Sequence, residues 1–140
     1  MTFLVTILFF LVNGLAAQTS PVGIWKTIDD KTGEPKSHME IYQQNGKLYG
    51  KIVKLLKVPS DKKCVACEGA RKDKPLLGMV IVENLTPYEE YWKGGTIIDP
   101  ASGSSYACSI WFEKGVKDEL KVRGKHWSGI YRTQTWYRIK

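Results

Sequence analysis

Residues 37–56 read SHMEIYQQNGKLYGKIVKLL, and this stretch decides the fold class. Two segments in which polar and apolar residues alternate, Ser37 to Gln44 and Lys47 to Leu56, are joined by Asn45-Gly46. Asn-Gly between two such segments is the strongest short-range signal for a β-hairpin. We therefore expect an antiparallel hairpin here, with the side chains of alternate residues on opposite faces.

Segments with the same period of two lie on both sides of this hairpin, and no stretch has a sustained helical period. We expect strands at Gly23 to Ile28, Ser37 to Gln44, Lys47 to Leu56, Leu77 to Leu85, Gly95 to Asp99, Tyr106 to Phe112, Glu119 to Arg123 and Ser128 to Ile139. A meander of about eight strands removes its exposed edges most simply by closing. The predicted fold class is mainly β, a single antiparallel meander closed into a calycin-like barrel. A two-layer sandwich is the alternative.

The first residues have the composition of a targeting segment. Met1 to Ala17 carry no charged side chain, and Phe3 to Val12 form an apolar run that small residues follow. This layout is typical of a secretory signal peptide, and the run is too short to span a bilayer. We expect residues 1–17 to be a signal peptide and residues 18–140 to form a single β-barrel domain, exported to the periplasm or secreted. The alternative is an N-terminal strand buried in the core.

The chain has 140 residues and a formal net charge of +7, with a net +4 in residues 54–74. Its length suits one hydrophobic core. Because an exported protein rarely meets nucleic acid, acidic envelope polymers, anionic lipid head groups or simple solvation account for the charge. No nucleophile, zinc-protease or phosphate-loop motif is present, and the two histidines, His38 and His126, lie far apart. We expect no enzymatic activity, no cofactor and no transmembrane segment in the mature chain.

A cysteine pair lies in the polar segment between Lys57 and Lys74, which we expect to be a long loop. The spacing Cys64-x-x-Cys67 allows a disulfide, a redox dithiol or half of a metal site. An oxidising compartment favours the disulfide. A redox or zinc protein built on Cys64 and Cys67 remains the alternative. Cys108 shares a face with apolar neighbours, which predicts a buried free thiol.

Five motifs follow one another along the chain: Gly23-x-Trp25, Cys64-x-x-Cys67, Trp92-x-Gly94-Gly95-x-Ile97-x-Asp99-Pro100, Leu120-x-Val122-Arg123-Gly124 and Arg132-Thr133-Gln134-Thr135-Trp136-x-Arg138. Together they resemble a bacterial exported family, catalogued as domain of unknown function 2147. This resemblance implies an envelope or secreted β domain without an assigned biochemical activity. A weaker likeness is to the lipocalin and fatty-acid-binding barrels. Their first strand carries Gly-x-Trp, and their last strand places an Arg near that Trp, as Arg132 or Arg138 would here.

The last strand suggests a binding site. Alternate residues of this strand place two arginines, an amide and an indole on one face, and Arg123 comes from the neighbouring strand. Because a guanidinium grips carboxylates and phosphates, we expect a site for a small anionic amphiphile. The residues that we expect to line it are Trp25, Arg123, Arg132, Gln134 and Trp136. In the alternative, Arg132 or Arg138 stacks on Trp25 to close the barrel end, and the other polar residues face water.

These patterns predict a non-enzymatic binding module that takes a small anionic or amphiphilic ligand. The first alternative is an envelope interaction protein that contacts an acidic partner through the basic loop around Cys64 and Cys67. The second is the redox or zinc protein.

Overall fold

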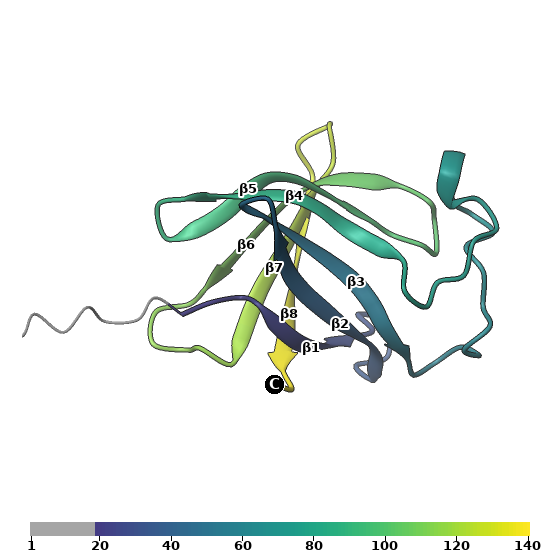
Figure 1. Cartoon of the computed structure of the whole chain (residues 1–140), viewed down its shortest axis with the longest axis horizontal. Helices are drawn as coiled ribbons and strands as arrows, with labels where there is room; N and C mark the ends of the chain where they lie inside the picture. Colours follow the sequence, from purple (N-terminus) through teal and green to yellow (C-terminus); the bar gives the residue numbers. More distant parts are fainter. Residues whose placement is uncertain (1–18) are drawn as a thin grey trace, which may run out of the picture.

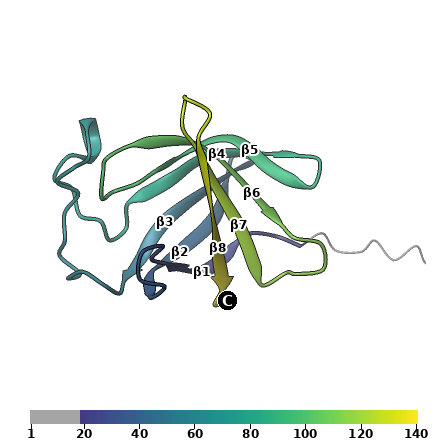
Figure 2. The same ribbon diagram turned by 180° about the vertical axis from the view of Figure 1, so that it is seen from behind.

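The computed structural model describes residues 19–140, so the predicted signal peptide lies outside the described residues. Eight antiparallel strands follow one another around a closed barrel, as Figures 1 and 2 show from opposite sides. They are β1 (Gly23–Ile28), β2 (Pro35–Gln44), β3 (Lys47–Leu55), β4 (Val80–Tyr88), β5 (Tyr91–Ile98), β6 (Ser105–Phe112), β7 (Glu119–Lys125) and β8 (Tyr131–Arg138). The predicted mainly β class and the closed meander are confirmed.

The β2–β3 hairpin forms where the Asn-Gly pair predicts it. Asn45 and Gly46 have φ angles of 53° and 76°, both in the left-handed region that a tight hairpin turn requires. Gln44 pairs with Lys47 across this turn. The hairpin therefore fixes the register in which the alternate residues of both strands face the barrel interior.

The barrel interior is filled by side chains. The inward-facing apolar residues are between 0% and 9% exposed: Trp25, Met39, Ile41, Leu48, Ile52, Val82, Leu85, Trp92, Cys108, Ile110, Leu120, Val122 and Trp136. An internal chamber large enough for a ligand would leave accessible surface on the side chains that line it. The interior is therefore a packed core, like that of other small barrels whose side chains meet at the axis.

The fourth and fifth strands differ from the sequence prediction. The prediction placed them at Leu77 to Leu85 and Gly95 to Asp99. In the structure β4 continues to Tyr88 and β5 begins at Tyr91, so a tight turn at Glu89-Glu90 joins them directly. The alternation is interrupted at Asn84, which has a φ of 60°. As a result Val82 and Leu85, three positions apart, are both buried, and the period of two is lost in the sequence.

The connection between β3 and β4, residues 56–79, forms a lid against one end of the barrel. It contains one short 3₁₀ helix, η1 (Gly69–Arg71), and the disulfide between Cys64 and Cys67. Both cysteines are buried and belong to the same core cluster as the barrel interior. The predicted disulfide is confirmed, and the lid that it braces is packed rather than free in solvent.

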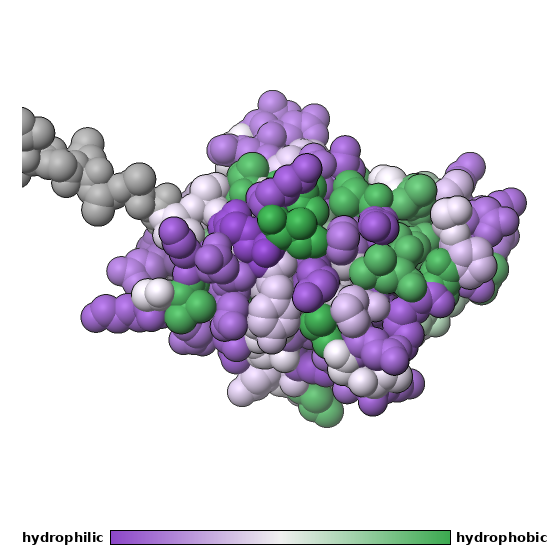
Figure 3. All heavy atoms as spheres, turned by 90° about the horizontal axis from the view of Figure 1, so that it is seen from below, coloured by the Kyte–Doolittle hydropathy of each residue, from purple (hydrophilic) through white to green (hydrophobic). Residues whose placement is uncertain are grey.

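The outer surface is largely polar. On the face shown in Figure 3, hydrophilic residues predominate and apolar residues form patches between them. Such patches are normal on a small globular protein. Among residues 19–140 no helix is both long enough and apolar enough to cross a membrane.

Candidate functional site

The site begins where the barrel closes. β1 and β8 pair at this seam through Trp25 opposite Arg138. The Arg138 guanidinium lies 4.3 Å from the centroid of the Trp25 ring and donates to the carbonyls of Ser20, at 2.8 Å, and Val22, at 3.3 Å. The Trp25 indole N–H donates to the Pro21 carbonyl at 2.8 Å. These bonds hold residues 19–22 at the end of the barrel opposite the lid.

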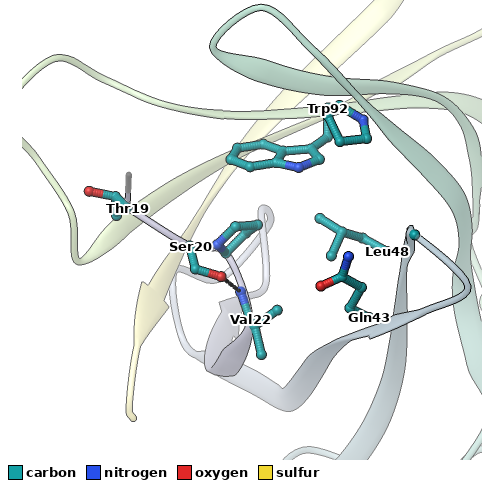
Figure 4. Close-up of a pocket in the computed structure, with 9 residues that line it drawn as sticks. Thr19, Ser20, Val22, Gln43, Leu48 and Trp92 are labelled. Carbon is teal, nitrogen blue, oxygen red and sulfur yellow. Dashed lines mark hydrogen bonds between the residues drawn. The ribbon is translucent and has the colours of Figure 1, made fainter. Parts of the chain in front are cut away.

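A hollow of about 170 Å³ opens at this end, and we call it the mouth pocket (Figure 4). Residues 19–22 form one side of it, and the ends of the β2–β3 and β4–β5 hairpins form the others. Its lining consists of Thr19, Ser20, Pro21, Val22, Gln43, Gly46, Leu48, Pro87 and Trp92. Trp92 and Leu48 also belong to the packed core, so the pocket is a depression in the end of that core.

The mouth pocket has a mixed lining of apolar and polar groups. The indoles of Trp25, Trp111 and Trp136 each donate to an acceptor within the chain, but no such bond joins the Trp92 indole N–H to any of residues 19–140. In Figure 4 this N–H and the Gln43 amide both lie toward the hollow. The pocket therefore combines an apolar surface with a donor that is available to a ligand acceptor.

The polar residues of the first half of β8, Arg132 and Gln134, lie toward the other end of the barrel, near the β1–β2 turn. Trp136 is 2% exposed, and its indole N–H donates to the side-chain oxygen Oε1 of Gln134 at 3.2 Å. The Gln134 amide in turn donates to Asp30 at 2.8 Å, and Arg132 lies 3.4 Å from the same carboxylate oxygen. The structure thus brings Arg132, Gln134 and Trp136 together: Asp30 is the partner of Arg132 and of the Gln134 amide N–H, and Gln134 is the partner of Trp136. Trp25 belongs to the same core cluster as Trp136, but its indole N–H bonds to Pro21 at the mouth.

Arg123 does not join this group, which corrects the sequence prediction. Leu120 and Val122 are the buried residues of β7, so Arg123 falls on the outer face. Its guanidinium lies 4.1 Å from the Tyr131 ring centroid and 4.9 Å from that of Trp111. The stacking on Trp25, which was predicted for Arg132 or Arg138, is made by Arg138.

The sequence analysis did not single out Gln43, Trp92 or residues 19–22 as a site. Gln43 had a detectable signal, because it has the same parity as Met39 and Ile41, whose side chains are buried. A polar residue at an inward position next to a turn marks the rim of a barrel. Residues 19–22 have no such signal, since their place depends on Arg138 at the far end of the chain.

The basic loop around Cys64 and Cys67, which was predicted to contact an acidic partner, is part of the lid. Arg71 pairs with the Glu83 carboxylate and donates to the Val80 carbonyl, and Lys72 donates to the Val65 carbonyl. These cations therefore brace the lid, while Lys62 and Lys63 are exposed.

Cys108 is buried, as predicted, and burial raises the pKa of its thiol to about 12. The thiol is therefore neutral at every pH at which the fold is normally studied, and the thiolate is the reactive form. Among residues 19–140 no three His, Cys, Asp or Glu side chains gather into a cluster suited to a metal ion.

Thiol titration of the native protein at pH 8 should detect no reactive cysteine, and titration after unfolding without reductant should detect one. The single thiol is that of Cys108, because Cys64 and Cys67 are joined. Ellman's reagent provides the measurement. Three thiols after unfolding would contradict the disulfide and would support the redox or zinc alternative.

The closed eight-stranded barrel, with a first-strand Trp beneath a last-strand Arg, defines a lipocalin-like fold. A solved structure with this fold is that of protein HP1028 from Helicobacter pylori, described as belonging to the lipocalin family. It matches with a TM-score of 0.74 and 20% sequence identity over 87% of this chain and 84% of that one. No curated protein matches the chain.

Residues 23–138 match the family described as "uncharacterized protein conserved in bacteria (DUF2147)", and the chain belongs to this family. The predicted family resemblance is thereby confirmed, as is the weaker likeness to lipocalins.

Proposed function

We propose that this protein is an exported, non-enzymatic binding module that takes a small anionic amphiphile at the mouth pocket. The observation that carries the proposal is the Trp92 indole N–H, which lies beside Leu48 on a partly apolar hollow and has no hydrogen-bond acceptor among residues 19–140. A hydrogen-bond donor held against apolar walls suits a ligand that has an apolar body and an acceptor group.

The packing of the barrel favours the mouth over the interior. Trp136 and Ile110 are at most 2% exposed, so a ligand inside the barrel would have to displace core side chains. Displacing a well-packed core is costly. The mouth pocket requires no such displacement, because it is already open.

The size of the mouth pocket limits what it accepts. Its volume of about 170 Å³ is close to that of an engineered cavity of about 150 Å³ that binds benzene. It therefore admits a ring or the last carbons of an alkyl chain, and leaves the polar head of the ligand at the rim. Exposed Lys47 directly follows the lining residue Gly46, so the rim carries a cation that favours an anionic head group.

Two observations support export and a carrier role. The Cys64–Cys67 disulfide fits an oxidising compartment such as the periplasm or the extracellular space. The protein with the similar fold from Helicobacter pylori is described as a lipocalin, and lipocalins are barrels that hold small ligands.

Replacement of Trp92 by Phe should weaken the binding of decanoate about tenfold, because the ring stays while the hydrogen bond to the carboxylate is lost. Isothermal titration of decanoate into both proteins measures the effect. Trp111→Phe is the matched control: the Trp111 indole N–H bonds to Glu113 on the outer face, so its loss should leave the affinity unchanged. Equal affinities for wild type and Trp92→Phe would overturn the proposal, as would the absence of decanoate binding.

A further inference from the structure

The turn between β7 and β8 projects from the barrel (Figures 1 and 2). Because successive strands run in opposite directions, this turn and the lid between β3 and β4 belong to the same end of the barrel. The apolar side chains of the β7–β8 turn are unusually exposed: Trp127 at 92%, Ile130 at 75% and Tyr131 at 57%. We call these three residues the tip. Large apolar side chains gathered at one exposed point commonly mark a site of interaction.

The turn holds the tip in a defined conformation. The backbone N–H of His126 donates to the Ile130 carbonyl at 2.8 Å, and that of Gly129 donates to the His126 carbonyl at 2.9 Å. The Ser128 hydroxyl and the His126 ring nitrogen Nδ1 are 2.8 Å apart and share a hydrogen bond. Because the turn is already ordered, an interaction at the tip loses little additional conformational freedom.

Basic residues surround the tip. Residues 121–132, which include the tip, contain four basic side chains and no acidic one. Lys125 and Arg132 lie at the base of the turn, and Lys125 is exposed. Arg132 lies near Asp30, while Arg123 stacks on Tyr131 and adds positive charge beneath the tip.

We propose that the tip docks this protein on the surface of an anionic lipid bilayer, with Trp127 and Ile130 inserted among the head groups. Lys125 and Arg132 then face the lipid phosphates. Trp is favoured at the boundary between water and hydrocarbon because its large ring is apolar and its N–H is polar. Anionic lipid surfaces attract Lys and Arg held close to them.

The shape of the tip favours a bilayer over a protein partner. Three apolar side chains on a projecting turn present much less than the roughly 800 Å² per partner that a stable protein interface buries. A bilayer accepts such a projection by insertion. The mouth pocket lies at the opposite end of the barrel, so docking through the tip leaves the pocket open, and this inference does not depend on the proposed ligand.

Co-sedimentation with vesicles tests the inference. Residues 18–140 contain every strand of the closed barrel, so this chain is used without the apolar leader. It should bind vesicles of phosphatidylcholine with about a quarter phosphatidylglycerol, and bind pure phosphatidylcholine far more weakly. Trp127→Ala should weaken binding to the anionic vesicles by about tenfold, because the inserted side chain is lost.

Two variants serve as controls. Trp127→Phe keeps a large apolar ring and should bind within about twofold of the wild type. Val65→Ala removes apolar surface from an exposed lid residue, 57% accessible, and should bind as the wild type does.

Three results would overturn the inference: no binding of the wild type to anionic vesicles, equal binding of wild type and Trp127→Ala, or equal binding to neutral and anionic vesicles. Sedimentation equilibrium without lipid adds a further check. A dimer formed by the wild type and lost in Trp127→Ala would assign the tip to contact between copies of the chain instead.

Discussion

Replacement of Trp25 by Ala should lower the free energy of unfolding by about 4 kcal/mol, a large share of the stability of a small domain. The side chain has no exposed surface and packs with its ring centroid 6.0 Å from that of Phe112. It also supports the Arg138 guanidinium and donates to the Pro21 carbonyl. Its removal leaves a cavity at the seam and releases residues 19–22.

Urea denaturation of this variant is best compared with that of Trp127→Ala. Both changes remove one indole, but Trp127 is 92% exposed, so its replacement should change the free energy of unfolding by no more than about 0.5 kcal/mol. Similar losses for the two variants would mean that Trp25 does not lie in a packed core at the seam.

The second large effect on stability is expected where the lid packs on the β5–β6 turn. Gly103, in the β5–β6 turn, has a φ of 74°, and a Cβ at this position would lie far inside van der Waals contact with the Ala66 carbonyl oxygen of the disulfide segment. Gly103→Ala therefore forces the lid away from the turn. We expect it to cost about 1–3 kcal/mol of unfolding free energy beyond the backbone strain of the substitution.

Gly33→Ala serves as the control that separates the clash with the lid from the backbone strain. Gly33 has a φ of 73°, but no heavy atom lies within 4 Å of where its Cβ would be. The two substitutions therefore share the backbone strain of a left-handed residue and differ in the clash. Thermal unfolding of both variants measures the difference. Equal stabilities would show that the lid does not pack on the β5–β6 turn.

Much of the fold follows from local sequence patterns. The hairpin at Asn45-Gly46, the first strand and the Cys64–Cys67 disulfide depend on neighbouring residues, and all three are as predicted. The prediction was wrong where the backbone departs from a regular strand. Asn84, with a positive φ, shifts the inward positions of β4. Asn tolerates the left-handed region, but this tolerance alone does not predict that Asn84 adopts it within a strand.

The mouth pocket is harder to predict because its lining comes from three separate parts of the chain. Residues 19–22 are placed by hydrogen bonds from Trp25 and Arg138, which meet only when the barrel closes. The same limit applies to Arg123. In β7, Arg123 lies on the face opposite to that of Leu120 and Val122, which are buried, so Arg123 points outward. Alternation alone does not say which face of a strand is the interior.

Decanoate titration followed by nuclear magnetic resonance of the indole N–H groups tests the proposed site most directly. The chain has five tryptophans, and single Trp→Phe variants assign their signals. Binding at the mouth should shift the signal of Trp92 and leave that of Trp136, bonded to Gln134, in place. A shift at Trp136 with none at Trp92 would place the ligand inside the barrel and contradict the account.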